Sequence, residues 1–224
     1  MRALAGRQDE VQALGTSDTS DEAAAFRAIQ DRLGPMYRDI FFDDNAPRTV
    51  VVLPSLSLDQ EVLAKISGVH HYEERMLCLL LLLRLPRTEV IFLTSKPVPE
   101  TIIDYYLHLL PGIPAQHARR RLKLFSCHDG SPIPLTEKLL ARPRLLARIR
   151  QAISDPDRTH MTCFNVTVRE RQLALALDIP LYGCDPDLID LGSKSGSRKT
   201  FRAAGIQLPD GAEDLRDAQD VSDA

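Results

Sequence analysis

Residues 49–54, Thr-Val-Val-Val-Leu-Pro, form a short β-branched apolar run that ends at a proline. β-Branched residues favour strands, and no polar residue interrupts the valines. A strand without polar alternation is typical of a parallel sheet that helices cover on both faces. Four later runs resemble it, at residues 89–93 (EVIFL), 122–125 (LKLF), 161–164 (MTCF) and, shorter, 179–182 (IPLY).

Helical patterns separate these runs. Apolar residues recur at helical spacing over residues 70–84, 99–110 and 168–177, and residues 135–153 predict two helices divided near Arg142-Pro143. Strands that alternate with helices favour βαβ units. The sequence therefore predicts an α/β fold, a doubly wound (Rossmann-like), mainly parallel sheet of about five strands with helices on both faces.

The two ends of the chain have a different character. Residues 1–18 are polar and aperiodic, so we expect a disordered leader, and residues 19–47 predict an N-terminal helix kinked at Gly34-Pro35. Residues 48–190 then hold the α/β domain. Residues 191–224 open with a Gly/Ser-rich stretch, continue with a short helix over 198–204, and end in an acidic tail. We expect this part to be a truncated C-terminal extension, the beginning of a second domain.

The overall charge argues against two classes of partner. The chain has 224 residues and a formal net charge of −3, so it has no global attraction to nucleic acid or to an anionic membrane. Its most apolar run, residues 76–83, is far shorter than the roughly 20 residues of a membrane span. No apolar signal region is visible near the N-terminus. We expect a cytoplasmic protein that binds neither nucleic acid nor membrane.

The cysteines and histidines do not predict a metal site. Cys78, Cys127, Cys163 and Cys184 form no C-x-x-C pair, and we expect buried free thiols. His70 and Glu74 share a helical face, but no third ligand is evident, so no metal ligands are predicted. Glu74 and Arg75 are expected to form ion pairs instead. The later basic residues, from Lys138 to Arg150, are expected on a solvated outer face.

Polar side chains follow the predicted strands where each strand ends. These residues are Ser55, Ser57, Thr94, Ser95, the segment 126–130 and Asn165. Ligands of doubly wound sheets gather at the carboxyl ends of the strands, so these side chains can line a small-molecule site. The same residue types also cap helices, and both interpretations stay open. The loop after the first strand lacks the glycines of a dinucleotide-binding fingerprint.

Lys194 stands in a Gly/Ser-rich turn, residues 191–197, that opens a helix. Such a turn can bring an ammonium group and backbone N–H groups to a phosphate. The pattern is common, and by itself it is a weak signal.

In combination, the chain resembles a known enzyme family. The segment LGSKSGSRKTFRAAGIQLPDG (191–211) is similar to the entry into an ATP-grasp fold. Upstream, the resemblance is to the pre-ATP-grasp domain of peptide ligases related to the pheganomycin-forming enzyme. The segments that carry it are VVLPSLSLD (51–59), YEERML (72–77), TSKP (94–97), IIDYYL (102–107), PLTEKLLARPRL (134–145) and FNVTVRER (164–171).

The resemblance implies an ATP-dependent carboxylate–amine ligase. ATP with Mg²⁺ would convert a carboxylate into an acyl phosphate, which an amine then attacks to form an amide or peptide bond. Lys194 stands at the position of a phosphate-contacting lysine, and the five strand-end residues Ser55, Ser57, Thr94, Ser95 and Asn165 would lie near a small carboxylate, amino acid or peptide substrate. The catalytic residues and the magnesium ligands are expected beyond residue 224, in the remainder of the ATP-grasp domain. The alternative is a stand-alone, non-catalytic α/β binding or regulatory module that lacks the ATP site.

Overall fold

A computed structural model describes residues 21–58 and 60–223. The expected leader, residues 1–18, lies outside this range. The chain divides into two compact units, residues 1–183 and residues 184–224, and each is described by itself.

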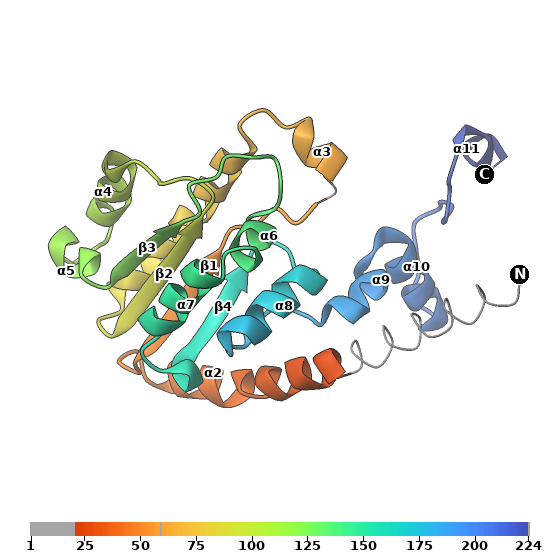
Figure 1. The fold of residues 1–224 in the computed structure, drawn as a ribbon. Coiled ribbons are helices and arrows are strands. Elements are labelled where there is room, and N and C mark those ends of the chain that lie inside the picture. The colour runs from red at the N-terminus through yellow and green to blue at the C-terminus, as the bar shows by residue number, and fades with distance from the viewer. Residues whose placement is uncertain (1–20, 59, 224) are drawn as a thin grey trace, which may run out of the picture. The chain divides into compact units, whose positions relative to one another are not determined.

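The first unit is built on a parallel sheet of five strands in the order β3-β2-β1-β4-β5 (Figure 1). The strands are β1 (Arg48–Leu53), β2 (Thr88–Thr94), β3 (Leu122–Ser126), β4 (Thr159–Cys163) and β5 (Leu181–Tyr182). β1 is central, and its Val51 pairs with Ile91 of β2 and Met161 of β4. The predicted fold class is confirmed.

Helices connect the strands and continue after the sheet. In the first unit, residues 21–30 are helical, and the further elements are α2 (Leu33–Phe42), α3 (Gln60–Ala64), η1 (Val69–Arg84), α4 (Glu100–His108), α5 (Ala115–Arg119), α6 (Leu135–Leu140), α7 (Pro143–Ala152), η2 (Pro156–Arg158) and α8 (Val168–Leu177). The second unit contains η3 (Pro186–Leu188), α9 (Ile189–Gly192), α10 (Lys194–Ala203) and α11 (Ala218–Asp223). The predicted division of residues 135–153 at Arg142-Pro143 is confirmed.

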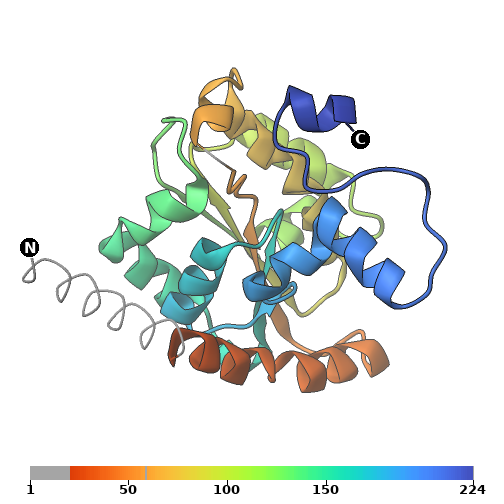
Figure 2. The same cartoon turned by 90° about the vertical axis from the view of Figure 1, so that its right-hand side faces the viewer.

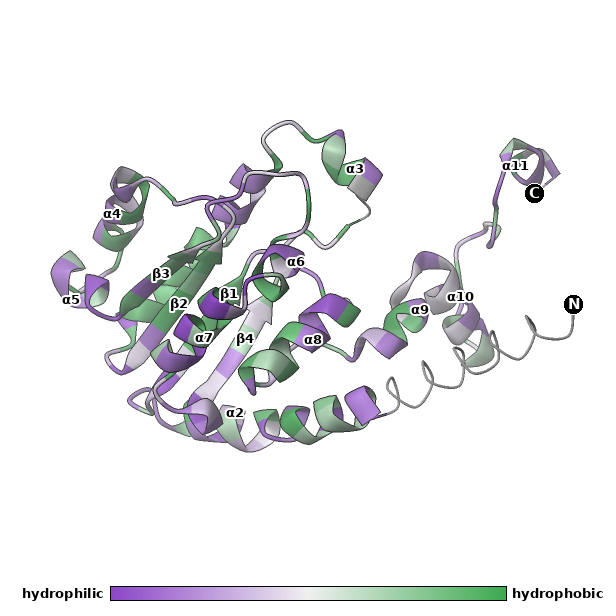
Figure 3. Ribbon diagram, viewed as in Figure 1, coloured by the Kyte–Doolittle hydropathy of each residue, from purple (hydrophilic) through white to green (hydrophobic). Residues whose placement is uncertain are grey.

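Alternate residues of β1 face two separate cores. Val51 and Leu53 pack with buried residues of α6, α7 and α8 and of the helical segment 21–30. Val50 and Val52 pack on the other face with residues of η1, α4 and α5. Figures 2 and 3 show these helices on either side of the sheet. This two-sided cover explains why the strand has no polar alternation.

The helix predicted over residues 70–84 differs in type. η1 is a 3₁₀ helix of 16 residues, much longer than usual for this conformation. Its leucines at 77, 80 and 83 are buried while Leu81 is 49% exposed, a spacing that matches three residues per turn.

None of the helices among the described residues is long and apolar enough to cross a membrane.

The N-terminal helix is interrupted earlier than the sequence predicts. The break falls at Asp31 and Arg32, where two turn residues separate the helical segment 21–30 from α2. Gly34 and Pro35 then lie in the first turn of α2, where a proline costs little because its missing N–H has no partner within the helix. The predicted kink at Gly34-Pro35 is therefore wrong by a few residues.

In the second unit, α10 begins at Lys194, earlier than the expected start at Arg198. Ser193 is its N-cap, and the Ser193 hydroxyl accepts a hydrogen bond from the Gly196 N–H at 2.9 Å. Arg198 and Arg202 of this helix both pair with Glu213. None of α9, α10 and α11 carries a buried residue.

Candidate functional site

The strand order reverses at β1, since the chain proceeds to β2 and β3 on one side and places β4 and β5 on the other. In such sheets the crevice for a ligand lies beyond the carboxyl ends of the strands at this reversal. Ser55 and Ser57 follow β1, and Asn165 follows β4. The Ser57 N–H donates to Asn165 Oδ1 at 3.0 Å, and Asn165 Nδ2 donates to the Ser57 carbonyl at 3.1 Å. The structure therefore brings these three predicted residues together.

Glu170 of α8 is the centre of the hydrogen bonds at this edge. Its carboxylate is fully buried and accepts from the hydroxyls of Ser57 and Thr136. It also accepts from the Thr167 N–H at 2.8 Å and the Thr167 hydroxyl at 2.6 Å, which completes a capping box at the start of α8. The Ser55 hydroxyl accepts from the Thr136 N–H at 3.2 Å and bonds the Ser57 hydroxyl at 3.0 Å.

A second cluster follows β2. The Ser95 N–H donates to Glu73 Oε2 at 2.6 Å, and Lys138 Nζ donates to the Ser95 hydroxyl at 2.9 Å. Burial raises the pKa of the Glu73 carboxyl and lowers the pKa of the Lys138 ammonium. Lys138 is 1% exposed. The expectation that it lies on a solvated outer face is therefore wrong.

A small cavity opens beside this cluster. It is lined by His70, Glu73 and Lys138 together with apolar side chains, and it has room for about one water molecule. Burial, followed by the charges of His71, Lys96 and Lys138, lowers the pKa of His70.

The loop after β3 adds an ion pair to this edge. Arg142 donates to Asp129 at 2.8 Å, while hydrogen bonds from Ser131, and then from Arg142, lower the pKa of the Asp129 carboxyl. The sequence predicts ion pairs for Glu74 and for Arg75. Glu74 contacts His71 at 2.8 Å, which is an ion pair when His71 is protonated. Arg75 forms no ion pair with a described residue, and its guanidinium stacks over the Tyr72 ring at 4.2 Å.

The five strand-end residues predicted near the substrate thus lie at one edge of the sheet. Ser55, Ser57, Thr94 and Ser95 are buried, and Asn165 is partly exposed. Their side-chain polar atoms already bond protein groups. Whether they contact a substrate stays a prediction.

Sequence reasoning missed the charged partners of these residues. Glu73, Lys138 and Glu170 are all buried, with exposures of 6%, 1% and 0%. Each lies inside one of the segments that carry the family resemblance, YEERML, PLTEKLLARPRL and FNVTVRER. The signal that could have identified them is a charged residue on the apolar face of a predicted helix, because such a residue needs a buried partner.

Lys194 lies at the first position of α10 in the second unit. Its side chain is exposed, and its ammonium forms no hydrogen bond or ion pair with any described residue. Gly196 is required two residues later, because a Cβ there would lie 1.6 Å from the Asp190 carbonyl oxygen. An ammonium group without a partner at the tight first turn of a helix matches the arrangement from which the sequence analysis infers phosphate binding.

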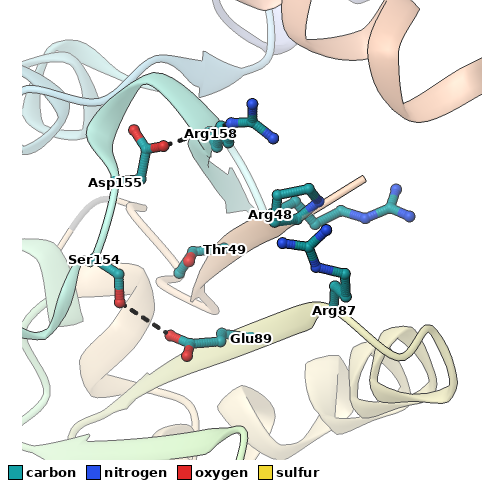
Figure 4. A pocket seen from close by; sticks show the side chains of 8 residues that line it. Arg48, Thr49, Arg87, Glu89, Ser154, Asp155 and Arg158 are labelled. Carbon is teal, nitrogen blue, oxygen red and sulfur yellow. Dashed lines mark hydrogen bonds and ion pairs between the residues drawn. The ribbon is translucent and has the colours of Figure 1, made fainter. Parts of the chain in front are cut away.

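A larger cavity, of about 490 Å³, lies at the opposite edge of the sheet, where the strands begin (Figure 4). Size alone does not make it the substrate site, since doubly wound folds bind their main ligands at the carboxyl ends. Over residues 21–58 and 60–223, no three His, Cys, Asp or Glu side chains lie close enough to share a metal ion.

The cysteines are all free thiols, but only Cys127 is buried, while Cys78 and Cys184 are exposed and Cys163 is intermediate. The expectation of buried thiols therefore fails for Cys78 and Cys184. The exposed position of Cys78 follows from the 3₁₀ spacing of η1, which buries its neighbours Leu77 and Leu80.

Comparison with known proteins finds two distant relatives. The chain is 27% identical over 187 residues to IQ motif-containing protein H of Danio rerio, covering 76% of this chain and 18% of that protein. It is 26% identical over 183 residues to L-propargylglycine–L-glutamate ligase of Streptantibioticus cattleyicolor, covering 79% of this chain and 38% of the ligase.

No family model matches the chain, and no solved structure matches it. The chain spans less than two fifths of the length of either curated relative. The comparisons therefore show that the chain is distantly similar to a carboxylate–amine ligase.

Proposed function

We propose that this chain is the substrate-side part of an ATP-dependent carboxylate–amine ligase of the ATP-grasp type. The observation that carries the proposal is the similarity to L-propargylglycine–L-glutamate ligase, which extends over 79% of the chain. The name of that relative describes the joining of two amino acids. A small carboxylate, amino acid or peptide is accordingly the proposed substrate class.

The carboxyl edge of the sheet supports this proposal. Five of the segments that carry the family resemblance reach that edge. Their polar residues form two hydrogen-bonded groups, one around Glu170 and one that includes Glu73, and α6 contributes a residue to each. A packed core has no need of so many buried polar groups, because each one must be hydrogen-bonded to offset the loss of water. Fixed hydroxyl, amide and ammonium groups can orient a carboxylate for activation.

Lys194 is the proposed phosphate-binding residue of this chain. Its free ammonium group and the first turn of α10 fit the triphosphate of ATP chemically. ATP with Mg²⁺ supplies the phosphoryl group that activates the carboxylate. The residues described here include no cluster of three possible metal ligands, so we assign the magnesium ligands and the amide-forming residues to polypeptide beyond residue 224.

The exposed apolar surface of the second unit supports this assignment. Its helices α9, α10 and α11 bury no residue, and seven of its large apolar side chains are at least 43% exposed: Leu188, Ile189, Leu191, Phe201, Ile206, Leu215 and Val221. Apolar surface of this extent gains free energy when it is covered. We propose the remainder of the ATP-grasp domain as the partner that covers it.

The test uses the product of the complete gene. Purified protein is incubated with ATP, Mg²⁺ and pairs of amino acids, and ADP release and new amide products are followed by coupled assay and mass spectrometry. The proposal predicts ADP release that depends on both amino acids, together with a ligated product. If no carboxylate or amine stimulates ADP release, the alternative of a non-catalytic binding or regulatory module is supported instead.

A further inference from the structure

An Arg-Thr pair lies at the start of each of three neighbouring strands. Arg48 is the first residue of β1, whereas Arg87 and Arg158 immediately precede Thr88 and Thr159, the first residues of β2 and β4; the three strands are adjacent in the order β2-β1-β4. The backbone pairing puts Thr49 opposite Thr159, so Arg48 and Arg158 are level with each other. The Arg48 N–H bonds the Arg87 carbonyl at 3.2 Å. The fold therefore gathers three arginines at the amino edge of the sheet.

These arginines line the cavity of about 490 Å³ at that edge, a size typical of small-ligand sites. Figure 4 shows the guanidinium groups of Arg48, Arg87 and Arg158 toward one side of the cavity, with Glu89 and Ser154 toward the other. All the lining residues belong to the first unit. The cavity is thus a site of its own, at the edge opposite to the proposed substrate site.

Positive charge exceeds negative charge in this cavity. Of its two carboxylates, Glu89 is paired with Lys123 at 2.7 Å, and Asp155 contacts Arg158 at 3.5 Å. The guanidinium group of Arg87 forms no hydrogen bond or ion pair with any residue in the described ranges. Two guanidinium groups, those of Arg48 and Arg87, therefore have no carboxylate partner within those ranges.

Of these two arginines, Arg48 has the less common environment, because its side chain is buried. It is 9% exposed, its Nε donates to the Thr88 hydroxyl at 3.1 Å, and its Nη2 is buried with no hydrogen-bond partner among the described residues. The charges of Asp44 and Asp43, which do not line the cavity, act on this guanidinium but form no ion pair with it. A buried cation without an ion-pair partner is costly, and an anion in the cavity lowers that cost.

Hydrogen bonding to nearby backbone carbonyls does not explain why the arginines lie at this edge. At this edge the carbonyls of Leu83, Leu85 and Thr88 already accept hydrogen bonds from Arg121. The guanidinium of Arg87 is thus left for another acceptor. Guanidinium groups present paired N–H donors that match carboxylate and phosphate oxygens.

We propose that this cavity binds a small oxyanion with two or more negative charges, held by Arg87 and Arg158 and by the field of Arg48. The chemistry is shared by phosphate-bearing and carboxylate-bearing ligands. The proposal concerns a second binding site and does not depend on the ligase function.

The experiment measures the binding of pyrophosphate and of citrate to the 224-residue chain by isothermal titration calorimetry. Saturable binding of at least one probe is expected, and Arg87→Ala is expected to weaken it about tenfold, the effect of losing one charge-assisted hydrogen bond. Arg87 is exposed and unpaired, so the variant should keep its fold, which circular dichroism checks. Arg158→Ala provides a second, independent loss of affinity.

Arg144→Ala is the matched control, because Arg144 is an exposed arginine of α7 without a partner among the described residues. It should change the affinity by less than about twofold. A preference for pyrophosphate would assign a phosphate-bearing ligand, and a preference for citrate a carboxylate-bearing one. If neither probe saturates, or if Arg87→Ala and Arg144→Ala weaken binding equally, the site does not exist.

Discussion

Glu170 shows how a single buried side chain can organise the carboxyl edge of the sheet. Its carboxylate receives four hydrogen bonds, from Ser57, from Thr136 and two from Thr167. These bonds connect the loop after β1 to the first turns of α6 and α8. The sequence predicts a helix over residues 168–177, but it does not reveal that the Glu170 carboxylate bonds two residues far away in the chain.

Glu170→Gln should destabilise the protein by about 1–3 kcal/mol, because the amide nitrogen is a donor that faces donors, and buried groups are left unsatisfied. The free energy of unfolding from urea titration measures the loss. Glu137→Gln is the control, since Glu137 is partly exposed and its carboxylate pairs, within the described ranges, with Arg169. It should cost less than about 0.5 kcal/mol. Equal losses in the two variants would contradict the central role of Glu170.

His160 makes the stability depend on pH. It is 7% exposed, and burial, followed by the charge of Arg48, lowers its pKa to about 4. In the unfolded chain it titrates near 6.5, so below that pH the unfolded state binds a proton that the folded state does not. Stability contributed by the neutral imidazole is therefore complete above pH 6.5 and is lost as the pH falls toward 4.

The loss between pH 7 and pH 5 should be about 2 kcal/mol for this group. The free energy of unfolding is measured at both pH values for the native protein and for His160→Gln. The variant should show a smaller difference between the two pH values, whatever its absolute stability. An unchanged difference would show that His160 is not the titrating group.

Lys194→Ala should weaken the use of ATP by the complete gene product about tenfold or more, because it removes a cation that we assign to the phosphates. Lys199→Ala is the control in the same helix, since Lys199 is already paired with Asp214 at 2.6 Å. The KM for ATP and kcat are compared in both variants. If Lys194→Ala leaves ATP use unchanged, the assignment of Lys194 is wrong.

At the scale of elements, the sequence predicts the sheet well because local composition and tertiary burial agree there. The β-branched run 49–53 becomes β1, and residues 168–177 become α8 with the predicted limits. What the sequence does not predict depends on contacts between distant segments. The pairing of Ser95 with Glu73 and Lys138, and the gathering of three arginines at the strand starts, exist only after the sheet has formed.

The 3₁₀ conformation of η1 could not be predicted for a different reason. Its leucine-rich run, residues 79–83, offers apolar residues at every helical period, so the pattern fits an α-helix and a 3₁₀ helix equally. Two neighbouring leucines distinguish these conformations. Leu80 is fully buried and Leu81 is 49% exposed, although an α-helix would place Leu81 on the same face as the buried Leu77.

Leu80→Ala should therefore cost about 2–5 kcal/mol, since it leaves a cavity in the core beneath η1. Leu81→Ala should cost less than about 1 kcal/mol, because its side chain is half in solvent. Thermal or denaturant unfolding of both variants provides the comparison. A large loss for Leu81→Ala would contradict the 3₁₀ spacing.

At the scale of the whole molecule, the two units differ in the interactions that stabilise them. The first has two apolar cores, one on each face of its sheet. The helices α9, α10 and α11 of the second bury no residue, and α10 is held to the loop that follows it by ion pairs of Arg198, Lys199 and Arg202. Exposed ion pairs contribute little to stability. The division into a substrate-side domain and the beginning of an ATP-grasp domain stays a prediction.

Trapping of an acyl phosphate tests the proposed function most directly. The complete gene product is incubated with ATP, Mg²⁺, a mixture of amino acids and hydroxylamine, which converts an acyl phosphate into a stable hydroxamate. The proposed function predicts a hydroxamate that forms only with ATP, together with one equivalent of ADP and phosphate, and the yield of hydroxamate should fall in Lys194→Ala. Release of AMP and pyrophosphate in place of ADP, or no hydroxamate with any carboxylate, would contradict it.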